Sequence, residues 1–114
     1  MKGKIVLRYI LVDVVARALA AGGIGGEIVL VDCLKDKAAA QAMDVADALS
    51  FPAVPVRVRA GDYMECADAD VTVVAIGKPR EPGQTRLDLL GDSVRMADGL
   101  CAALRETGVG GLVI

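Results

Sequence analysis

The sequence has 114 residues, of which 54% are hydrophobic, 25% are charged and 3% are aromatic, and its formal net charge is −2. This length and apolar content predict one folded domain over residues 1–114. The chain has no long run of either charge and few aromatic side chains, which argues against a nucleic-acid partner. Charged residues interrupt the apolar N-terminal stretch, so we expect neither a membrane span nor a signal peptide.

Three cysteines, Cys33, Cys66 and Cys101, are widely spaced and form no C-x-x-C pair. This pattern is typical of free thiols in a reducing compartment, and we expect a cytoplasmic protein. The chain contains no histidine. A mechanism that needs an imidazole must therefore obtain it from elsewhere. Asp68 and Asp70 precede a strand without a third ligand nearby, which favours turn chemistry, so no metal site is predicted.

Apolar runs and three- to four-residue spacings predict strands and helices that alternate along the chain. Glycines at 22–26 are expected to end the first helix and lead into a strand, because a phosphate-binding glycine loop would follow a strand instead. In chain order, the expected elements are strand 4–7 passing into a helix that ends near 21, strand 27–32, helix 35–49, strand 54–59, a short turn or helix 64–67, strand 71–76, a helix from about 87 to 107 capped by Gly108, and a strand from about 112. The alternation predicts an α/β fold with a doubly wound parallel sheet.

Several side chains receive structural interpretations from these patterns. Met43 is expected to fill the core, and Cys101 is expected to be buried in the apolar stripe of the last helix. Strand 54–59 contains a proline and reads as an edge strand, with Arg57 and Arg59 protecting that edge from pairing. The chain stops inside its last predicted strand, which suggests a fragment of a longer protein.

The stretch from Gly77 to Arg86 concentrates the candidate chemistry, because it follows a buried strand and ligands bind outside the carboxyl ends of parallel strands. Arg80 and Arg86 flank a Pro/Gly turn, and each offers a planar fork of donors that matches a carboxylate or a polarised carbonyl. A solvated loop with two surface arginines is the alternative. Asp32, at the end of the second strand, either accepts the hydroxyls of an adenosine ribose or closes the strand as an ordinary loop residue.

Four segments together resemble the coenzyme-binding half of the malate and lactate dehydrogenase family. They are Glu27–Asp32, Gln41–Asp44, Val58–Tyr63 and Pro79–Leu89, and the resemblance extends from about Lys4 to Ile114. It implies a Rossmann-type NAD-binding domain, truncated before the catalytic domain that carries the family's His and Asp. The chain alone is therefore expected to be inactive, and the complete protein is expected to be a homo-oligomer.

The resemblance also implies roles for individual residues. Arg86 matches the catalytic and substrate-binding arginine that polarises the substrate carbonyl, and Arg80 matches the position that binds the distal carboxylate of malate or oxaloacetate. Asp32 matches the ribose-binding acid, and Ile76 and Gly77 fall at the cofactor site. An NAD-dependent malate dehydrogenase of the lactate-dehydrogenase-like type is favoured, acting on a dicarboxylate. The alternative is an L-lactate or other 2-hydroxyacid dehydrogenase.

Two departures from the family pattern bear on NAD. Where the family has G-x-G-x-x-G after its first strand, residues 8–14 contain no glycine and include Asp13, whose charge would repel a pyrophosphate. Ser93 replaces the asparagine expected after the loop. The missing glycines, together with the missing histidine, support a third possibility, a degenerate or engineered Rossmann domain that neither binds NAD nor catalyses.

Overall fold

The computed structural model describes residues 4–8, 12–49, 55–76 and 80–114, and the elements follow the expected order. The elements are β1 (Lys4–Arg8), α1 (Val12–Ala21), β2 (Glu27–Val31), α2 (Lys35–Ala48), β3 (Arg57–Gly61), the 3-10 helix η1 (Tyr63–Cys66), β4 (Val71–Val74), α3 (Leu90–Thr107) and β5 (Leu112–Val113). The predicted alternation of strands and helices is confirmed, and the predicted strand at 54–59 begins and ends a few residues later.

The five strands form one parallel sheet in the order β3-β2-β1-β4-β5. Their register aligns the carboxyl ends, since Arg8 lies opposite both Val31 and Val74, and Val31 lies opposite Gly61. The chain builds outward from β1 in both directions, so the strand order reverses between β1 and β4. That switch point is where open α/β sheets bind ligands, and the loop after β4 leaves the sheet beside it.

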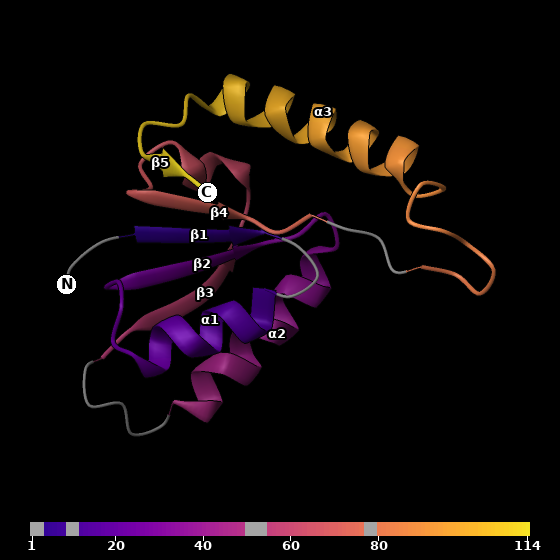
Figure 1. The fold of residues 1–114 in the computed structure, drawn as a ribbon. Coiled ribbons are helices and arrows are strands. Elements are labelled where there is room, and N and C mark those ends of the chain that lie inside the picture. Colours follow the sequence, from indigo (N-terminus) through magenta and orange to yellow (C-terminus); the bar gives the residue numbers. More distant parts are fainter. Residues whose placement is uncertain (1–3, 9–11, 50–54, 77–79) are drawn as a thin grey trace.

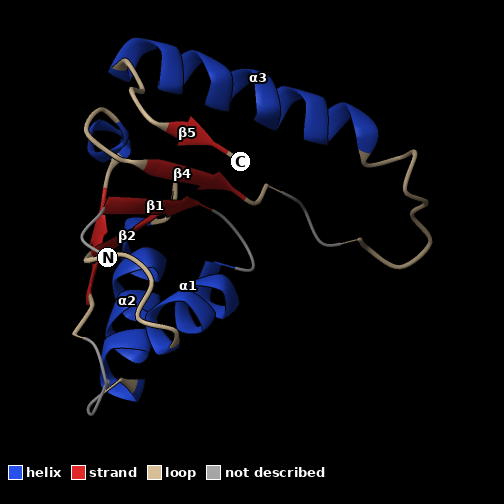
Figure 2. Ribbon diagram, turned by 60° about the vertical axis from the view of Figure 1, so that its left-hand side comes forward, coloured by secondary structure: helices blue, strands red, loops and turns tan. Residues whose placement is uncertain are grey.

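Helices cover both faces of the sheet, as the doubly wound prediction requires (Figures 1 and 2). One core lies under α1 and α2, and the other lies under η1 and the end of α3. Strand β2 supplies both cores because its side chains alternate, Ile28 and Leu30 facing one and Val29 and Val31 the other. Small residues on the helices, such as Ala16 and Ala42, let α1 and α2 approach the sheet closely.

Two predictions about buried side chains are wrong. Met43 is 66% exposed, because α2 turns a neighbouring stripe, Ala38, Ala42 and Val45, toward the sheet. Cys101 is exposed, because the apolar stripe of α3 that contains it is only partly covered; the buried residue of α3 is Leu100, which lies beside that stripe. On α3 and β5, the exposed large apolar side chains are Leu90, Val94, Leu112 and Val113.

Glycines act at two positions near the end of the chain. Gly108 adopts a left-handed conformation (φ 71°) and ends α3, which confirms the predicted cap. At Gly111, a Cβ atom would lie 2.2 Å from the carbonyl oxygen of Ala69, so only glycine allows β5 to approach β4 in this register.

Two further features are absent from the part of the chain that the structure describes. No helix there combines the length and the apolar character that crossing a bilayer requires. Nor do three or more His, Cys, Asp or Glu side chains gather there in a way that could hold a metal ion.

The buried hydroxyl of Thr72 is expected to lower the stability of the fold. Its side chain is 2% exposed, and its Oγ1 is buried without a hydrogen-bond partner. An unsatisfied buried hydroxyl costs about 1–3 kcal/mol, so Thr72→Val should raise the free energy of unfolding by about 1 kcal/mol, measured by thermal denaturation. Thr107→Val is the matched control, because Thr107 Oγ1 donates to the carbonyl oxygen of Leu104 and its loss should not stabilise. A lower melting temperature for Thr72→Val would contradict this account of the hydroxyl.

Candidate functional site

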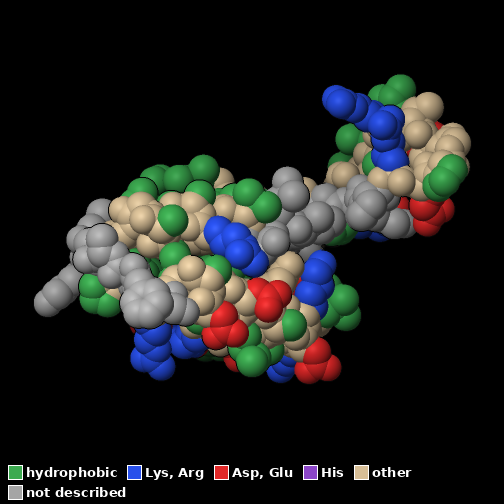
Figure 3. Space-filling model, turned by 90° about the horizontal axis from the view of Figure 1, so that it is seen from below, with side chains coloured by type: hydrophobic (Ala, Val, Ile, Leu, Met, Phe, Trp, Pro, Cys, Tyr) green, Lys and Arg blue, Asp and Glu red, His purple; other side chains and the backbone are tan. Residues whose placement is uncertain are grey.

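The loop that follows β4 projects from the carboxyl edge of the sheet (Figure 1). Ala75 and Ile76 continue from the strand and are half-buried, while Gly77 lies outside the described residues. The cofactor role predicted for Gly77 is therefore not described by the structure, and that of Ile76 stays a prediction. From Arg80 to Leu89 the chain stands away from the body of the domain before α3 returns across the sheet (Figures 1 and 3).

Arg80 and Arg86 both lie on this projecting loop and are exposed. Figure 3 shows basic side chains on the segment that stands apart from the main body. Neither arginine forms an ion pair with any residue that the structure describes. Both guanidinium groups are therefore available to an anionic or polarised ligand, although the loop carries them away from the strand ends.

Asp32 lies directly after β2, half-buried at the carboxyl edge. Its Oδ1 accepts a hydrogen bond from the Leu34 backbone N–H at 3.0 Å and another from Cys33 Sγ at 3.3 Å. These bonds match the alternative in which the residue closes the strand and leads into α2. They do not exclude a ligand, because a carboxylate has two oxygens and several acceptor sites. Asp32 follows β2 at the carboxyl edge, whereas the segment between β4 and α3 projects away from the sheet (Figure 1).

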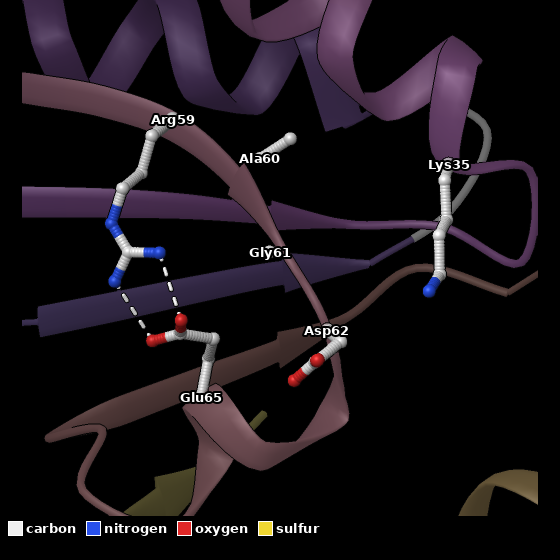
Figure 4. Close-up of a pocket in the computed structure, with 6 residues that line it drawn as sticks. All are labelled: Lys35, Arg59, Ala60, Gly61, Asp62 and Glu65. Atoms are coloured by element: carbon white, nitrogen blue, oxygen red, sulfur yellow. Dashed lines mark hydrogen bonds and ion pairs between the residues drawn. The ribbon is translucent and has the colours of Figure 1, made fainter.

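Two shallow hollows flank the start of α2. One, of about 440 Å³, is lined by residues 33–37 immediately after Asp32. The other, of about 290 Å³, lies at the carboxyl end of β3 and is shown in Figure 4. Its lining residues are Lys35, Arg59, Ala60, Gly61, Asp62 and Glu65. Lys35 belongs to both hollows, so a basic side chain lies between them.

Arg59 anchors an ionic cluster at the second hollow. Its two terminal nitrogens donate to the two oxygens of Glu65 at 2.8 Å each (Figure 4). Its Nε donates to Glu27 Oε1 at 2.5 Å. Lys4 Nζ pairs with Glu65 and with Asp68, each at 2.5 Å. Arg59 thus has partners that the sequence analysis did not predict, while its role in edge protection stays a prediction; β3 does occupy the sheet edge as expected.

The cluster controls the ionisation of its members. Hydrogen bonds from Arg59 and Lys4 lower the pKa of Glu65 to about 2. Hydrogen bonds to Glu65 and Glu27 raise the pKa of Arg59 above its usual value. Burial opposes the charged form of Lys4, but its bonds to Asp68 and Glu65 outweigh that effect and raise its pKa. Each charge is thus held by a partner.

Sequence reasoning missed this cluster because it depends on strand register. Arg59 lies opposite Val29, and Glu27 precedes Val29 by two residues, so both charges fall on the same face of neighbouring strands. Opposite charges at alternating positions of two predicted strands could have indicated an ion pair between those strands. Without the pairing of β2 with β3 and the turn into η1, however, the partners could not be matched.

A family match covers residues 11–114, and the family is the NAD-binding domain of lactate/malate dehydrogenases. The chain belongs to this family. The L-lactate dehydrogenase of Priestia megaterium is 38% identical over 92 residues, which are 81% of this chain and 29% of that protein. The L-lactate dehydrogenase of Pediococcus pentosaceus is 36% identical over 99 residues, 87% of this chain and 31% of that protein. The chain thus spans about a third of the length of these relatives.

Solved structures of the family have the same fold. The minor L-lactate dehydrogenase of Enterococcus mundtii superposes with a TM-score of 0.91 at 29% identity, covering 98% of this chain and 36% of that one. The malate dehydrogenase of Picrophilus torridus superposes with a TM-score of 0.81 at 24% identity, covering 92% and 35%. The predicted Rossmann-type fold and the family resemblance are confirmed.

NAD is the cofactor of this domain family, and the residues present fit its two halves unequally. On the ribose side, Asp32 stands at the end of β2, where a carboxylate can accept the two hydroxyls. On the pyrophosphate side, β1 ends at Arg8 and α1 begins at Val12, a β-branched residue, with no glycine among residues 8–14. Glycines allow the backbone to approach a pyrophosphate, so this connection does not fit that group as the family's motif does.

Glu65 generates a prediction about acid stability. Its pKa of about 2 in the folded state lies below the ordinary value of 4.5, so it contributes stability above about pH 4.5 that is lost as pH falls toward 2. In urea titrations, Glu65→Gln should therefore be destabilised most near pH 6, and its deficit relative to the parent should shrink toward pH 2. The exposed residue Glu106 provides the control variant Glu106→Gln, with a small deficit at every pH. An equal deficit for Glu65→Gln at pH 6 and pH 2 would overturn the assignment.

Proposed function

We propose that this chain is the coenzyme-binding domain of a longer NAD-dependent 2-hydroxyacid dehydrogenase. The observation that carries the proposal is a projecting loop at the carboxyl edge of the sheet, which bears two exposed arginines, Arg80 and Arg86, without an ion-pair partner among the described residues. The names of the relatives favour L-lactate and pyruvate as the substrate pair. We also expect the complete protein to be cytoplasmic and to form a homo-oligomer. Sedimentation of the complete protein would test its oligomeric state.

Arg80 supports malate and oxaloacetate as the second candidate pair. A dicarboxylate has a distal carboxylate that a guanidinium fork can bind with two parallel hydrogen bonds. A monocarboxylate such as pyruvate would leave that cation unpaired once water is excluded, which is unfavourable. The names of the relatives and the identity of residue 80 thus favour different substrates within one reaction class.

Arg86 is proposed to serve the reaction itself, whichever substrate binds. NAD supplies the chemistry of hydride acceptance and donation when bound. The guanidinium of Arg86 would lie against the substrate carbonyl oxygen and stabilise the negative charge that develops there. This stabilisation is strong only where water is excluded, so the exposed loop must be covered or must close for Arg86 to act. The chain has no histidine to hold the accompanying proton, and the isolated domain is expected to show no turnover.

Substrate choice can be tested at Arg80 in the complete protein. The values of kcat/KM for oxaloacetate and pyruvate are compared with NADH as the reductant. Arg80→Gln should lower kcat/KM for oxaloacetate by about 100-fold, because a charged hydrogen-bonded pair is lost, while pyruvate changes by less than tenfold. Arg57→Gln, on the far edge of the sheet, is the control. If the unmodified protein has the higher kcat/KM for pyruvate, it belongs to the lactate class. If Arg80→Gln lowers kcat/KM equally for both substrates, Arg80 does not discriminate between them.

The affinity of the domain for the cofactor can be tested by calorimetric titration of the domain itself. If the ribose side holds the ligand and the pyrophosphate side adds little, then NADH and adenosine should bind with Kd values within about threefold of each other. Asp32→Ala should weaken both by about tenfold, since it removes charged acceptors, whereas Asp36→Ala on α2 should not. An NADH Kd more than tenfold tighter than that of adenosine would contradict the unequal fit.

A further inference from the structure

The projecting loop closes a turn on itself directly after Arg80. The backbone N–H of Gln84 donates to the carbonyl oxygen of Glu81 at 3.1 Å, and the N–H of Glu81 donates to Gln84 Oε1 at 3.0 Å. Pro82 and Gly83 occupy the two central positions, and Gly83 has φ 86°, which is the signature of a type II turn. The Gln84 side chain thus ties down the residue that follows Arg80.

A second closed turn follows and encloses Arg86. The N–H of Thr85 donates to Asp88 Oδ2 at 2.7 Å, and the N–H of Asp88 donates to Thr85 Oγ1 at 3.3 Å. The bonds from Thr85 hold the pKa of Asp88 below its usual range. The N–H of Leu90 then donates to the carbonyl oxygen of Leu87 as α3 begins.

Local bonds are what orient this loop, because it stands clear of the sheet and the helices (Figure 1). An arginine side chain has several rotatable bonds, and a reacting group displaced by about 1 Å can lose about 100-fold in rate. Fixing the backbone on both sides of each arginine reduces the conformational freedom that must be lost when substrate binds. Two consecutive closed turns also fix the separation between the two guanidinium-bearing residues.

We propose that Gln84 and Asp88 are positioning residues, Gln84 for the backbone that carries Arg80 and Asp88 for the backbone that carries Arg86. Neither side chain is proposed to touch the substrate. The inference rests on the proposed function, because it assigns both arginines to a 2-hydroxyacid. It goes further by separating the two arginines into independently supported units, so that damage to one turn should spare the other.

Amide hydrogen exchange in the isolated domain tests the two turns without any enzyme activity. Gln84→Ala should speed exchange at the Glu81 amide at least tenfold and leave Thr85 protected. Asp88→Ala should do the reverse, and Asp88→Asn should retain most of the protection because it keeps an acceptor oxygen. Asp98→Ala, on the exposed side of α3, is the control and should change neither amide. Unchanged exchange in both alanine variants would overturn the proposal.

Kinetics of the complete protein test positioning against mere structural support. Gln84→Ala should raise KM for oxaloacetate about tenfold and change pyruvate reduction little. Asp88→Ala should lower kcat about tenfold for both substrates with KM nearly unchanged, and Asp88→Asn should restore most of it. If amide exchange is faster but both variants change KM and kcat in the same way, the positioning roles are overturned while the proposed function stands. An unmodified protein that reduces neither substrate would overturn the proposed function, and the roles with it.

Discussion

The bidentate bond between Arg59 and Glu65 is the contact on which the second layer of this domain depends. No long helix connects β3 with β4, so the short helix η1 covers that part of the sheet together with the end of α3. Arg59 fixes Glu65 of η1 over the sheet while also holding Glu27 of β2, and Lys4 of β1 reaches the same carboxylate. Gly61 permits this approach, because a Cβ there would lie 2.8 Å from Glu65 Cγ.

That anchoring determines where the candidate site begins. With η1 held down, the following turn delivers the chain into β4 beside β1, and Lys4 contributes again because its backbone N–H donates to Asp70 Oδ2 at 2.7 Å. Strand β4 then ends level with β1, at the point where the strand order reverses. The loop with the two arginines leaves from this position, so a charge cluster on one face of the sheet sets the origin of a loop at its carboxyl edge.

Sequence patterns predicted the elements well because each depends on local periodicity, and the Pro82-Gly83 pair predicted its turn for the same reason. The patterns failed where the contacts of a side chain depend on the rotation of a helix about its axis or on the register between two strands. Helix α2 is rich in alanine, so two neighbouring stripes satisfy the three- to four-residue spacing, and the wrong one placed Met43 inside. The stripe of α3 was read correctly as apolar, but spacing cannot show whether another element covers it, and Cys101 is exposed. Arg59 required the β2–β3 register, which no local pattern contains.

The two halves of the family's site also differ in how they depend on the rest of the chain. Recognition of a pyrophosphate uses backbone N–H groups at a strand-to-helix connection, so it requires glycines at that connection, and residues 8–14 have none. The family match begins at residue 11, after β1 has ended. The side chains that we propose bind substrate lie on a loop that hydrogen-bonds to itself, and the bonds that close its two turns lie between residues 81 and 88. The turns of the loop therefore do not depend on the first connection, and the chain has both loop arginines although it lacks the glycines at residues 8–14.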